Sequence, residues 1–330
     1  MHGKLSLKGA MAAAAMLALP QFASTAIAQT WPQRTITIIV SQPAGTSPDI
    51  LSRLLSERLS GEFKQGVITE NKAGGGNVVG SVAAARAAPD GHTFFFATSA
   101  ALVTNPFMMK ALPYDPIKDF APVAFIGRSS QLIVVNPQVA AKTLPELIAL
   151  EKKTPGKLTV GVDGPRSLAG VTTLALNKGT GMQLVSVPYP NLVSGVQDLV
   201  AGRFEVGVFS VSLVEGLVRD GKLRAIAGAA ATPVGALPDV PLASATIPGF
   251  DYSGWFMLMA PAGTSPDIVA RMNTALNAAM RDEKVRATVP KLGFEVDDKG
   301  LGTPQDAVKI LNDQMALWKK TTAYLGIEPQ

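Results

Sequence analysis

The chain has 330 residues, of which 47% are hydrophobic, and its formal net charge at pH 7 is +5. It contains no cysteine, which excludes a disulfide framework, a thiol nucleophile and a lipid-anchored cysteine. The positive charge is weak and forms no polybasic run, so nothing indicates binding to nucleic acid or to a membrane surface.

The first 28 residues have the pattern of an export signal. Lys4 and Lys8 form a short basic segment, an apolar run follows from Gly9 to Leu19, and Ala26-Ile27-Ala28 supplies the small residues of a cleavage site. The apolar run is too short to span a bilayer. We therefore expect a freely soluble periplasmic protein, cleaved after Ala28.

Beyond this segment, strand-like and helix-like stretches alternate along the chain, which predicts an α/β fold with largely parallel sheets covered by helices. Strands are expected at 35–41, 66–70, 93–98, 122–127, 131–136, 157–162, 183–187, 204–209, 223–228 and 254–260. Helices are expected at 48–60, 78–87, 144–153, 168–178, 192–201, 213–220, 266–280 and 304–324.

The octapeptide Pro-Ala-Gly-Thr-Ser-Pro-Asp-Ile occurs twice, at 43–50 and at 261–268, each time between an apolar strand and an amphipathic helix. In each copy we expect the serine, Ser47 or Ser265, to be the N-cap, with the proline at the first helical position and the aspartate in the first turn. Such a helix end points free N–H groups beyond the strand tips, where an anion can bind. Helix capping alone would also explain both copies.

Roughly 300 mature residues exceed what one hydrophobic core usually serves, so we expect two lobes. The second octapeptide follows a strand of the same kind as the first. We therefore expect residues 29–129 and 252–330 to form lobe 1 and residues 130–251 to form an inserted lobe 2. Two crossover segments, near 127–130 and 251–254, would then act as a hinge.

The sequence offers few groups for catalysis. Beyond the signal segment His92 is the only histidine, and its place in the turn at 89–92 favours a surface position. A zinc site and most catalytic triads are therefore hard to assemble. The run Gly74-Gly75-Gly76-Asn77 lacks the spacing of a nucleotide-binding motif, and we interpret it as a turn before the next helix. We expect no cofactor and no metal.

Polar loops follow several predicted strands, and ligands of open parallel sheets bind outside the carboxyl ends of the strands. The candidate loops are Gly45-Thr46-Ser47, Thr98-Ser99-Ala100, Asp163-Gly164-Pro165-Arg166-Ser167 and Tyr189-Pro190-Asn191. Binding a carboxylate with micromolar affinity needs about four or five charge-assisted hydrogen bonds, which backbone N–H groups of facing loops can supply. Arg166 would add a bidentate contact if it is not simply solvated.

Many short segments, in order along nearly the whole mature chain, resemble the substrate-binding proteins of tripartite tricarboxylate transporters, also called the Bug family. The segments that carry this likeness are Trp31-Pro32, Ile36 to Val40, the loop with Gly45 and Asp49, Glu70-Asn71, Gly74-Gly75-Gly76-Asn77, Ala87-Ala88-Pro89-Asp90-Gly91, Thr98-Ser99, Asn105-Pro106, Leu112-Pro113-Tyr114-Asp115-Pro116, Asp119-Phe120-Ala121-Pro122-Val123, Val187-Pro188-Tyr189, Leu237-Pro238-Asp239-Val240-Pro241 and Ala260-Pro261-Ala262-Gly263-Thr264.

The resemblance implies a type II periplasmic binding protein, in which two doubly wound α/β lobes close on a small carboxylate without catalysis. The ligand-binding residues that it implies in lobe 1 are Pro43, Ala44, Gly45, Thr46, Ser47, Asp49, Thr98 and Ser99. Those that it implies in lobe 2 are Asp163, Gly164, Arg166, Ser167, Tyr189 and Asn191. The chain departs from the family at its first loop, which has less glycine, near Ser167, where a histidine is replaced, and at Pro190-Asn191. The ligand's identity therefore stays open.

The expected partners are a di-, tri- or aromatic carboxylate and the membrane components of such a transporter. We expect a monomer and no nucleic acid. Two other functions stay open: a sensory protein that binds the same ligands and reports to a membrane kinase, and an exported hydrolase that uses Ser47, Ser99 and Asp163.

Overall fold

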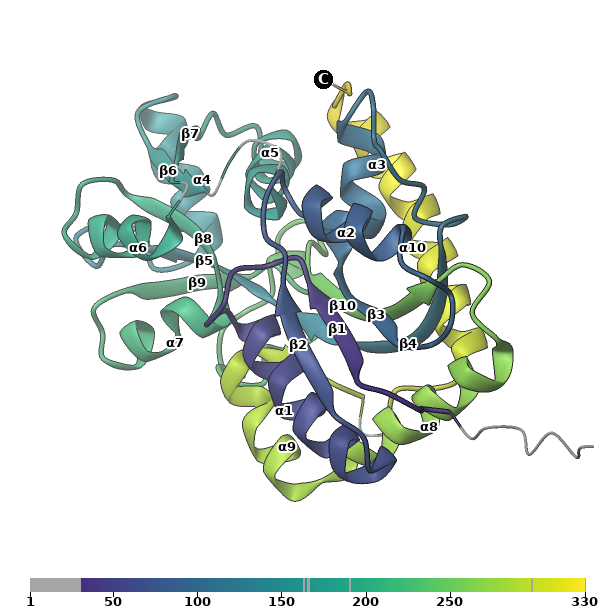
Figure 1. Ribbon diagram of the computed structural model, residues 1–330. Coiled ribbons are helices and arrows are strands. Elements are labelled where there is room, and N and C mark those ends of the chain that lie inside the picture. The colour runs from purple at the N-terminus through teal and green to yellow at the C-terminus, as the bar shows by residue number, and fades with distance from the viewer. Residues whose placement is uncertain (1–30, 163, 165–166, 190, 298, 330) are drawn as a thin grey trace, which may run out of the picture.

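The computed structural model describes residues 31–162, 164, 167–189, 191–297 and 299–329, so the expected export signal lies outside the described part of the chain. Helices and strands alternate and build two separate sheets (Figure 1). The strands are β1 (Ile36–Val40), β2 (Val67–Asn71), β3 (Thr93–Thr98), β4 (Phe120–Ser129), β5 (Gln131–Val135), β6 (Thr159–Val162), β7 (Val185–Pro188), β8 (Val206–Ser210), β9 (Arg224–Gly228), β10 (Gly254–Pro261) and β11 (Phe294–Glu295).

The α-helices are α1 (Ser47–Phe63), α2 (Val78–Ala85), α3 (Asn105–Met108), α4 (Leu144–Lys153), α5 (Leu168–Thr180), α6 (Leu192–Val200), α7 (Val211–Arg219), α8 (Pro266–Arg281), α9 (Glu283–Thr288) and α10 (Pro304–Leu325). A π-helical turn, η1 (Ala100–Thr104), follows β3, and two 3₁₀ turns are η2 (Ala243–Ala245) and η3 (Pro290–Leu292). Among the described residues, none of these helices is long and apolar enough to cross a membrane.

The two sheets are connected by two crossings of the chain. The first sheet has the order β11-β4-β10-β3-β1-β2 and the second has the order β7-β6-β8-β5-β9. The chain leaves the first sheet between β4 and β5 and returns to it between β9 and β10. We call each sheet with its helices a lobe, and Figure 1 shows lobe 2 to the left of lobe 1. The predicted fold class, two α/β lobes joined by two crossing segments, is confirmed.

The expectation of largely parallel sheets is wrong, because both sheets are mixed. β1 runs parallel to β2 and β3, and β6 runs parallel to β7 and β8. In contrast, β10 is antiparallel to β3 and β4, and β5 is antiparallel to β8 and β9. Parallel neighbours need a crossover connection such as a helix. β5 and β10 enter their sheets directly from the other lobe, so they are free of that requirement.

Alternating side chains of the central strands build a core on each face of each sheet. In β3, Phe94 and Phe96 pack with α1 and α8, while Phe95 and Ala97 pack with η1 and α10 on the other face. In β5, Ile133 and Val135 pack with α4 and α5, while Leu132 and Val134 pack with α6 and α7. Strands buried on both faces are fixed in register, so the loops at their ends have fixed positions.

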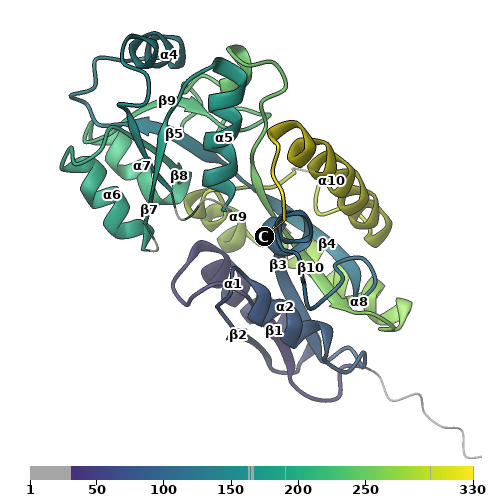
Figure 2. The same ribbon diagram turned by 90° about the horizontal axis from the view of Figure 1, so that it is seen from above.

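The C-terminal helix α10 belongs to lobe 1 but also touches lobe 2. Figure 2 shows α10 beside α5, and Lys178 of α5 places its ammonium nitrogen 5.0 Å from the ring centre of Tyr324 in α10. Leu325 and Tyr252 pack against the cores of both lobes. Burial first, and then the nearby Tyr324 and Asp251, together raise the pKa of Tyr252 to about 12.

The expectation that His92 lies on the surface is wrong, because its side chain is buried. Its Nδ1 lies 3.3 Å from the Asp90 carboxylate, and its Nε2 accepts a hydrogen bond from the Gln33 backbone N–H. The residue precedes β3, at the amino end of that strand. It therefore lies at the opposite end of the strand from the candidate loops, and the hydrogen bonds explain its burial.

Candidate functional site

The carboxyl ends of three lobe 1 strands lie side by side. Val40, the last residue of β1, pairs with Asn71 at the end of β2 and with Phe96 near the end of β3. The loops at 41–47 and 72–77 and the turn after Thr98 therefore meet at one edge of the sheet. This places the first two predicted ligand-binding segments of lobe 1 next to each other.

The loop that contains the first octapeptide turns at Gly45, whose φ of +82° favours glycine. The Thr46 hydroxyl donates to the Pro43 carbonyl over 2.7 Å. Thr46, not Ser47, is the N-cap of α1, and its side chain makes no capping hydrogen bond. The expected N-cap at Ser47 is therefore wrong by one residue. Pro43, Ala44 and Gly45 are exposed at the tip of the loop.

Asp49 is buried, with 2% of its surface exposed, and its carboxylate forms hydrogen bonds that fix the loop. One oxygen accepts the Gly45 N–H over 2.8 Å, and the other accepts the Asn71 amide over 2.9 Å and lies 3.0 Å from the Arg53 guanidinium. Burial alone would raise the pKa of Asp49, but these donors outweigh it and hold the pKa below its usual value. Asp49 is therefore ionised and fully occupied by the protein itself.

Two asparagines that sequence reasoning did not name as site residues complete this network. Asn71 also donates to the Gln42 carbonyl over 3.1 Å. Asn77 precedes α2 with a φ of +78° and accepts hydrogen bonds from the side chains of Ser41 and Gln42. Both lie in segments that carry the family resemblance, which was the available signal. The glycine run before Asn77 is a turn that leads into a helix, as predicted.

Thr98 is the last residue of β3 and Ser99 follows it, at a point where the two lobes touch. Both are buried, with 7% and 6% of their surface exposed. The Thr98 hydroxyl accepts the Ala101 N–H over 3.1 Å, and the Ser99 hydroxyl accepts the Trp255 N–H over 3.4 Å. Within the described part of the chain, the backbone N–H group of Ala100 donates to no protein acceptor. The turn therefore presents one free donor.

In lobe 2, the carboxyl ends of β6 and β7 also lie together, since the Tyr189 N–H donates to the Val162 carbonyl over 2.7 Å. Ser167 is the N-cap of α5: its hydroxyl accepts the Gly170 N–H and donates to the Gly164 carbonyl over 2.7 Å. Gly164 has a φ of +156°. The predicted site residues Asp163 and Arg166 lie outside the described residues.

Tyr189 and Asn191 make contacts within lobe 2. The Tyr189 hydroxyl donates to the Asp198 carboxylate over 3.0 Å, and its ring lies 5.2 Å from that of Phe204. Burial first, and then the negative charge of Asp198, raise the pKa of Tyr189. Asn191 is the N-cap of α6 and accepts the Val193 N–H. The side chains of Tyr189 and Asn191 are therefore used to build their own lobe.

The carboxyl-end edge of the lobe 1 sheet faces that of the lobe 2 sheet where the lobes meet. The Ser47 hydroxyl at the start of α1 donates to the Ser212 hydroxyl at the start of α7 over 3.1 Å. At the other end of the contact, a Cβ placed on Gly254 would lie 3.3 Å from Leu168 of α5 and 4.0 Å from the Ser99 hydroxyl. The sequence predicted this helix at 213–220 but did not indicate that its N-terminus belongs to the site, because the helix begins directly after β8 without a polar loop between them.

The chemistry of this region is that of an anion-binding surface. In the described chain the N–H groups of Ser47 and Asp49, like that of Ala100, donate to no protein acceptor. Free N–H groups at a helix N-terminus attract negative charge. The described residues contain no cluster of three histidine, cysteine or acidic side chains that would hold a metal ion.

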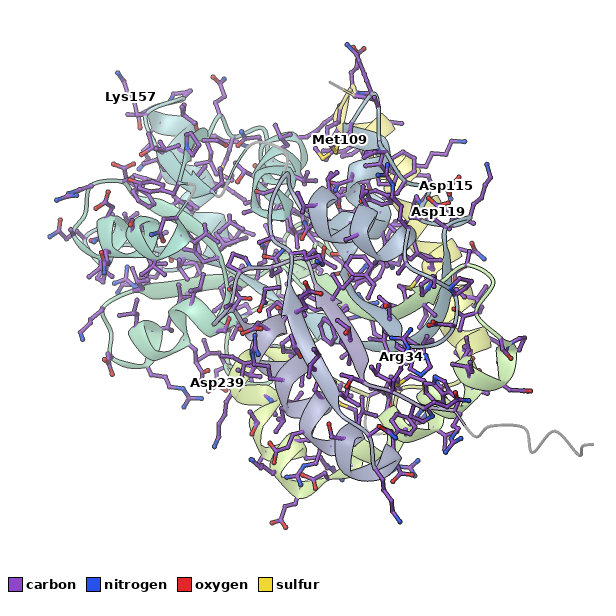
Figure 3. All side chains as sticks on the ribbon, in the orientation of Figure 1. Arg34, Met109, Asp115, Asp119, Lys157 and Asp239 are labelled. Carbon is purple, nitrogen blue, oxygen red and sulfur yellow. The ribbon has the colours of Figure 1, made fainter. Side chains whose placement is uncertain are left out.

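Acidic side chains elsewhere are used by their own loops. Asp115 accepts the N–H groups of Ile117 and Lys118, and Asp119 accepts the Asp115 N–H over 2.7 Å. Figure 3 shows Asp115 and Asp119 together on the side of lobe 1 that faces away from lobe 2. A surface pocket of about 410 Å³ lies between Arg219 and residues 235–240 of lobe 2. Neither feature adjoins the contact between Ser47 and Ser212.

Comparison with known proteins identifies relatives over nearly the whole chain. The family described as "Tripartite tricarboxylate transporter family receptor" matches residues 51–327. The protein BugT of Bordetella pertussis is 31% identical over 304 residues, which cover 92% of this chain and 92% of BugT.

Two similar solved structures are named with a bound ligand. One, from R. palustris with adipate, is 28% identical, has a TM-score of 0.82 and is matched over 91% of this chain and 100% of that chain. The other, MatC from Rhodopseudomonas palustris with bound malate, is 28% identical, has a TM-score of 0.76 and is matched over 88% of this chain and 99% of that chain. The fold is therefore that of periplasmic binding proteins.

Proposed function

We propose that this chain, which belongs to the tripartite tricarboxylate transporter receptor family, captures a small organic carboxylate between its lobes and delivers it to the membrane components of a transporter. Members of the family are periplasmic solute-binding receptors and not enzymes. The single observation that carries the proposal is the meeting of the α1 and α7 N-termini at Ser47 and Ser212, with free N–H groups beside it.

The free donors of lobe 1 would supply only part of the free energy of binding a carboxylate. Hydrogen bonds to a charged group contribute about 1.5–3 kcal/mol each, so the N–H groups of Ser47, Asp49 and Ala100 would together contribute roughly 4.5–9 kcal/mol. Micromolar binding corresponds to about 8 kcal/mol, and part of the gross gain is lost in desolvating the carboxylate. Donors from both lobes would therefore be needed, and both lobes would have to close on the ligand.

The ligand class follows from the relatives and from the donors. Two similar proteins were solved with adipate and with malate, both dicarboxylates. We infer that lobe 1 binds one carboxylate and that lobe 2 binds the ligand's far end near Ser167. Asp163, Arg166, Tyr189 and Asn191 stay proposed contacts in lobe 2. The hydroxyl and the backbone N–H of Tyr189 already donate to Asp198 and to the Val162 carbonyl, so its contact with the ligand would be a packing contact.

Ligand entry would require the lobes to separate. Ser99 is 6% exposed, and Leu168 of lobe 2 lies beside it. We propose that residues 29–129 with 252–330 move against residues 130–251 about the two crossing segments. We further propose that residues 1–28 direct export and are removed after Ala28, and that the mature protein is a monomer.

Isothermal titration calorimetry tests the proposed function. The mature protein is titrated with adipate, malate, citrate and benzoate, and saturable one-to-one binding of at least one of them is expected. Recovery of the unchanged ligand after incubation is the control for catalysis. A folded protein that binds none of these acids, or that hydrolyses an ester or amide, contradicts the proposal. Ligand-dependent capture of a membrane kinase instead of a transporter subunit would favour the sensory function.

A further inference from the structure

The two copies of the octapeptide form the same local turn. Gly45 and Gly263 have φ values of +82° and +86°. In each copy the threonine hydroxyl donates to the proline carbonyl three residues earlier, over 2.7 Å. The likeness continues to an arginine four residues after each aspartate, Arg53 and Arg271. The local sequence therefore determines the turn in both places.

The two aspartates nevertheless have different surroundings. Asp49 is buried and accepts hydrogen bonds from Gly45 and Asn71, whereas Asp267 is exposed and, within the described chain, accepts none. Arg53 forms an ion pair with Asp49. Arg271 instead donates to the Trp31 carbonyl and lies 5.7 Å from the centre of the Trp31 ring. The difference must therefore come from tertiary partners, of which Asn71 on β2 is specific to the first copy.

The helix starts also differ. In the first copy the helix begins at Ser47 with Thr46 as its N-cap, and in the second it begins at Pro266 with Ser265 as its N-cap, one position later in the octapeptide. The bond from the Gly45 N–H to the Asp49 carboxylate spans the turn at this point. It fixes the loop where the N–H groups of Ser47 and Asp49 are left free for a ligand.

Direct contact between the Asp49 carboxylate and a ligand is unfavourable. Both of its oxygens are occupied by protein donors, and its negative charge would repel an anionic ligand. Asn71 uses its amide group on Asp49 and Gln42, and its side-chain oxygen accepts from Arg53 over 2.7 Å. Neither side chain has a group left to offer to the ligand.

We propose that Asp49 and Asn71 are positioning residues, which hold the loop at 42–47 so that its N–H groups face the ligand, and that neither side chain touches the ligand. This inference rests on the proposed carboxylate-binding function. It changes the role expected for Asp49 from a ligand contact to a support. It also assigns a role to Asn71, which the sequence did not suggest.

The experiment compares Asp49→Ala, Asp49→Asn and Asn71→Ala with Asp267→Ala, which removes the matching aspartate of the second octapeptide. Affinity for adipate and malate is measured by calorimetry, thermal stability by the melting temperature, and loop order by hydrogen exchange at residues 43–50. Loss of charge-assisted hydrogen bonds in the loop should weaken binding roughly 10- to 100-fold in the first three variants. Asp267→Ala should change affinity less than about twofold.

A positioning role has signatures that a merely structural role lacks. Exchange at 43–50 should become faster in the Asp49 and Asn71 variants while exchange in the cores of both lobes stays unchanged. Combining Asp49→Ala with Asn71→Ala should cost no more affinity than one of them alone, because both act through the same loop. If Asp49→Ala fails to fold, the affinity and the hydrogen exchange of Asn71→Ala alone test the positioning role.

Three results would overturn the inference. Tighter binding by Asp49→Asn would show that the carboxylate faces the anionic ligand. Unchanged affinity in the Asp49 and Asn71 variants would show that the loop needs no support. Equal exchange at 43–50 in Asp49→Ala and Asp267→Ala would show that Asp49 does not order the loop. If the unmodified protein binds neither acid, the proposed function fails on these probes, and the exchange comparison still decides the positioning role.

Discussion

The Ser47 hydroxyl at the start of α1 lies 3.1 Å from the Ser212 hydroxyl at the start of α7, although the two residues are 165 positions apart and belong to different lobes. The N-terminal ends of two helices therefore face each other across the lobe contact. Both ends carry partial positive charge, so an anion between them would be attracted by both lobes. The contact explains how a carboxylate can favour lobe closure without any catalytic group.

Filling this contact with a large side chain should prevent closure. Ser47→Phe places a ring where the Ser212 hydroxyl lies, and overpacking typically costs about 1–3 kcal/mol, so affinity for the ligand should fall roughly tenfold or more. Ser265→Phe is the matched control, because Ser265 has the same place in the second octapeptide and is exposed. Calorimetry checks the difference. Equal affinities for the two variants would contradict a role for this contact.

A second prediction concerns Glu295 of β11, which ties lobe 1 to lobe 2. Its carboxylate accepts the Ser130 hydroxyl over 2.6 Å and the Thr232 hydroxyl over 3.2 Å, and Ser130 is fully buried. Glu295→Ala leaves a buried hydroxyl without its acceptor, so the free energy of unfolding should fall by about 1–3 kcal/mol.

Urea unfolding measures this loss, and Glu57→Ala is the control. Glu57 forms an exposed ion pair with Lys284 over 3.4 Å, and its removal should change stability by less than about 0.5 kcal/mol. An equal effect of both substitutions would show that the Glu295 link does not stabilise the protein.

The positions of most strands and helices could be predicted from the sequence because hydrophobic periodicity is local. Strand 93–98 and helix 144–153 were placed at their observed bounds. The antiparallel direction of β10 could not be predicted, since it depends on the return of the chain from lobe 2. The six-residue helix α9 was missed because its few residues carry too little periodicity to be recognised.

The site could be predicted only in part. The loops after β1 and β3 were found because polar residues follow apolar strands. The different surroundings of the aspartates in the two octapeptides could not be predicted. They depend on Asn71, which is 22 residues from Asp49 in sequence. Likewise, Tyr189 stands in a polar loop, yet its ring packs on Phe204 and its hydroxyl binds Asp198.

The charge on Asp49 predicts a pH dependence of stability. The pKa of Asp49 is lowered in the folded protein, so its contribution to stability is present above the unfolded value near 3.8 and is lost as the pH falls through the folded pKa. The unmodified protein should exceed Asp49→Asn in stability by about 1–3 kcal/mol between pH 8 and pH 5.

This difference should shrink below about pH 4, where Asp49 becomes protonated first in the unfolded chain and, at lower pH, in the folded protein as well. Chemical unfolding of both proteins over this pH range provides the measurement. A stability difference that grows on acidification would show that the folded pKa is raised and not lowered.

A fourth prediction concerns Tyr252, which packs against the cores of both lobes. Its pKa is raised to about 12 by burial and by the nearby Tyr324 and Asp251, so its phenol should stay protonated well above the usual value near 10. Its contribution to stability is present below pH 10 and should be lost as the pH rises through about 12.

Alkaline absorbance titration of the unmodified protein and of Tyr252→Phe isolates this phenol. The difference between the two curves should titrate near pH 12. A difference curve centred near pH 10 would show that Tyr252 is exposed to solvent and does not pack between the lobes.

The most direct test is a crystal structure of the mature protein with a bound dicarboxylate. One carboxylate group should lie between the lobes, within hydrogen-bond distance of the N–H groups of Ser47 and Ala100, with the ligand chemically intact. A ligand held by one lobe alone, for example in the pocket at residues 235–240, or a ligand that has been cleaved, would contradict the account.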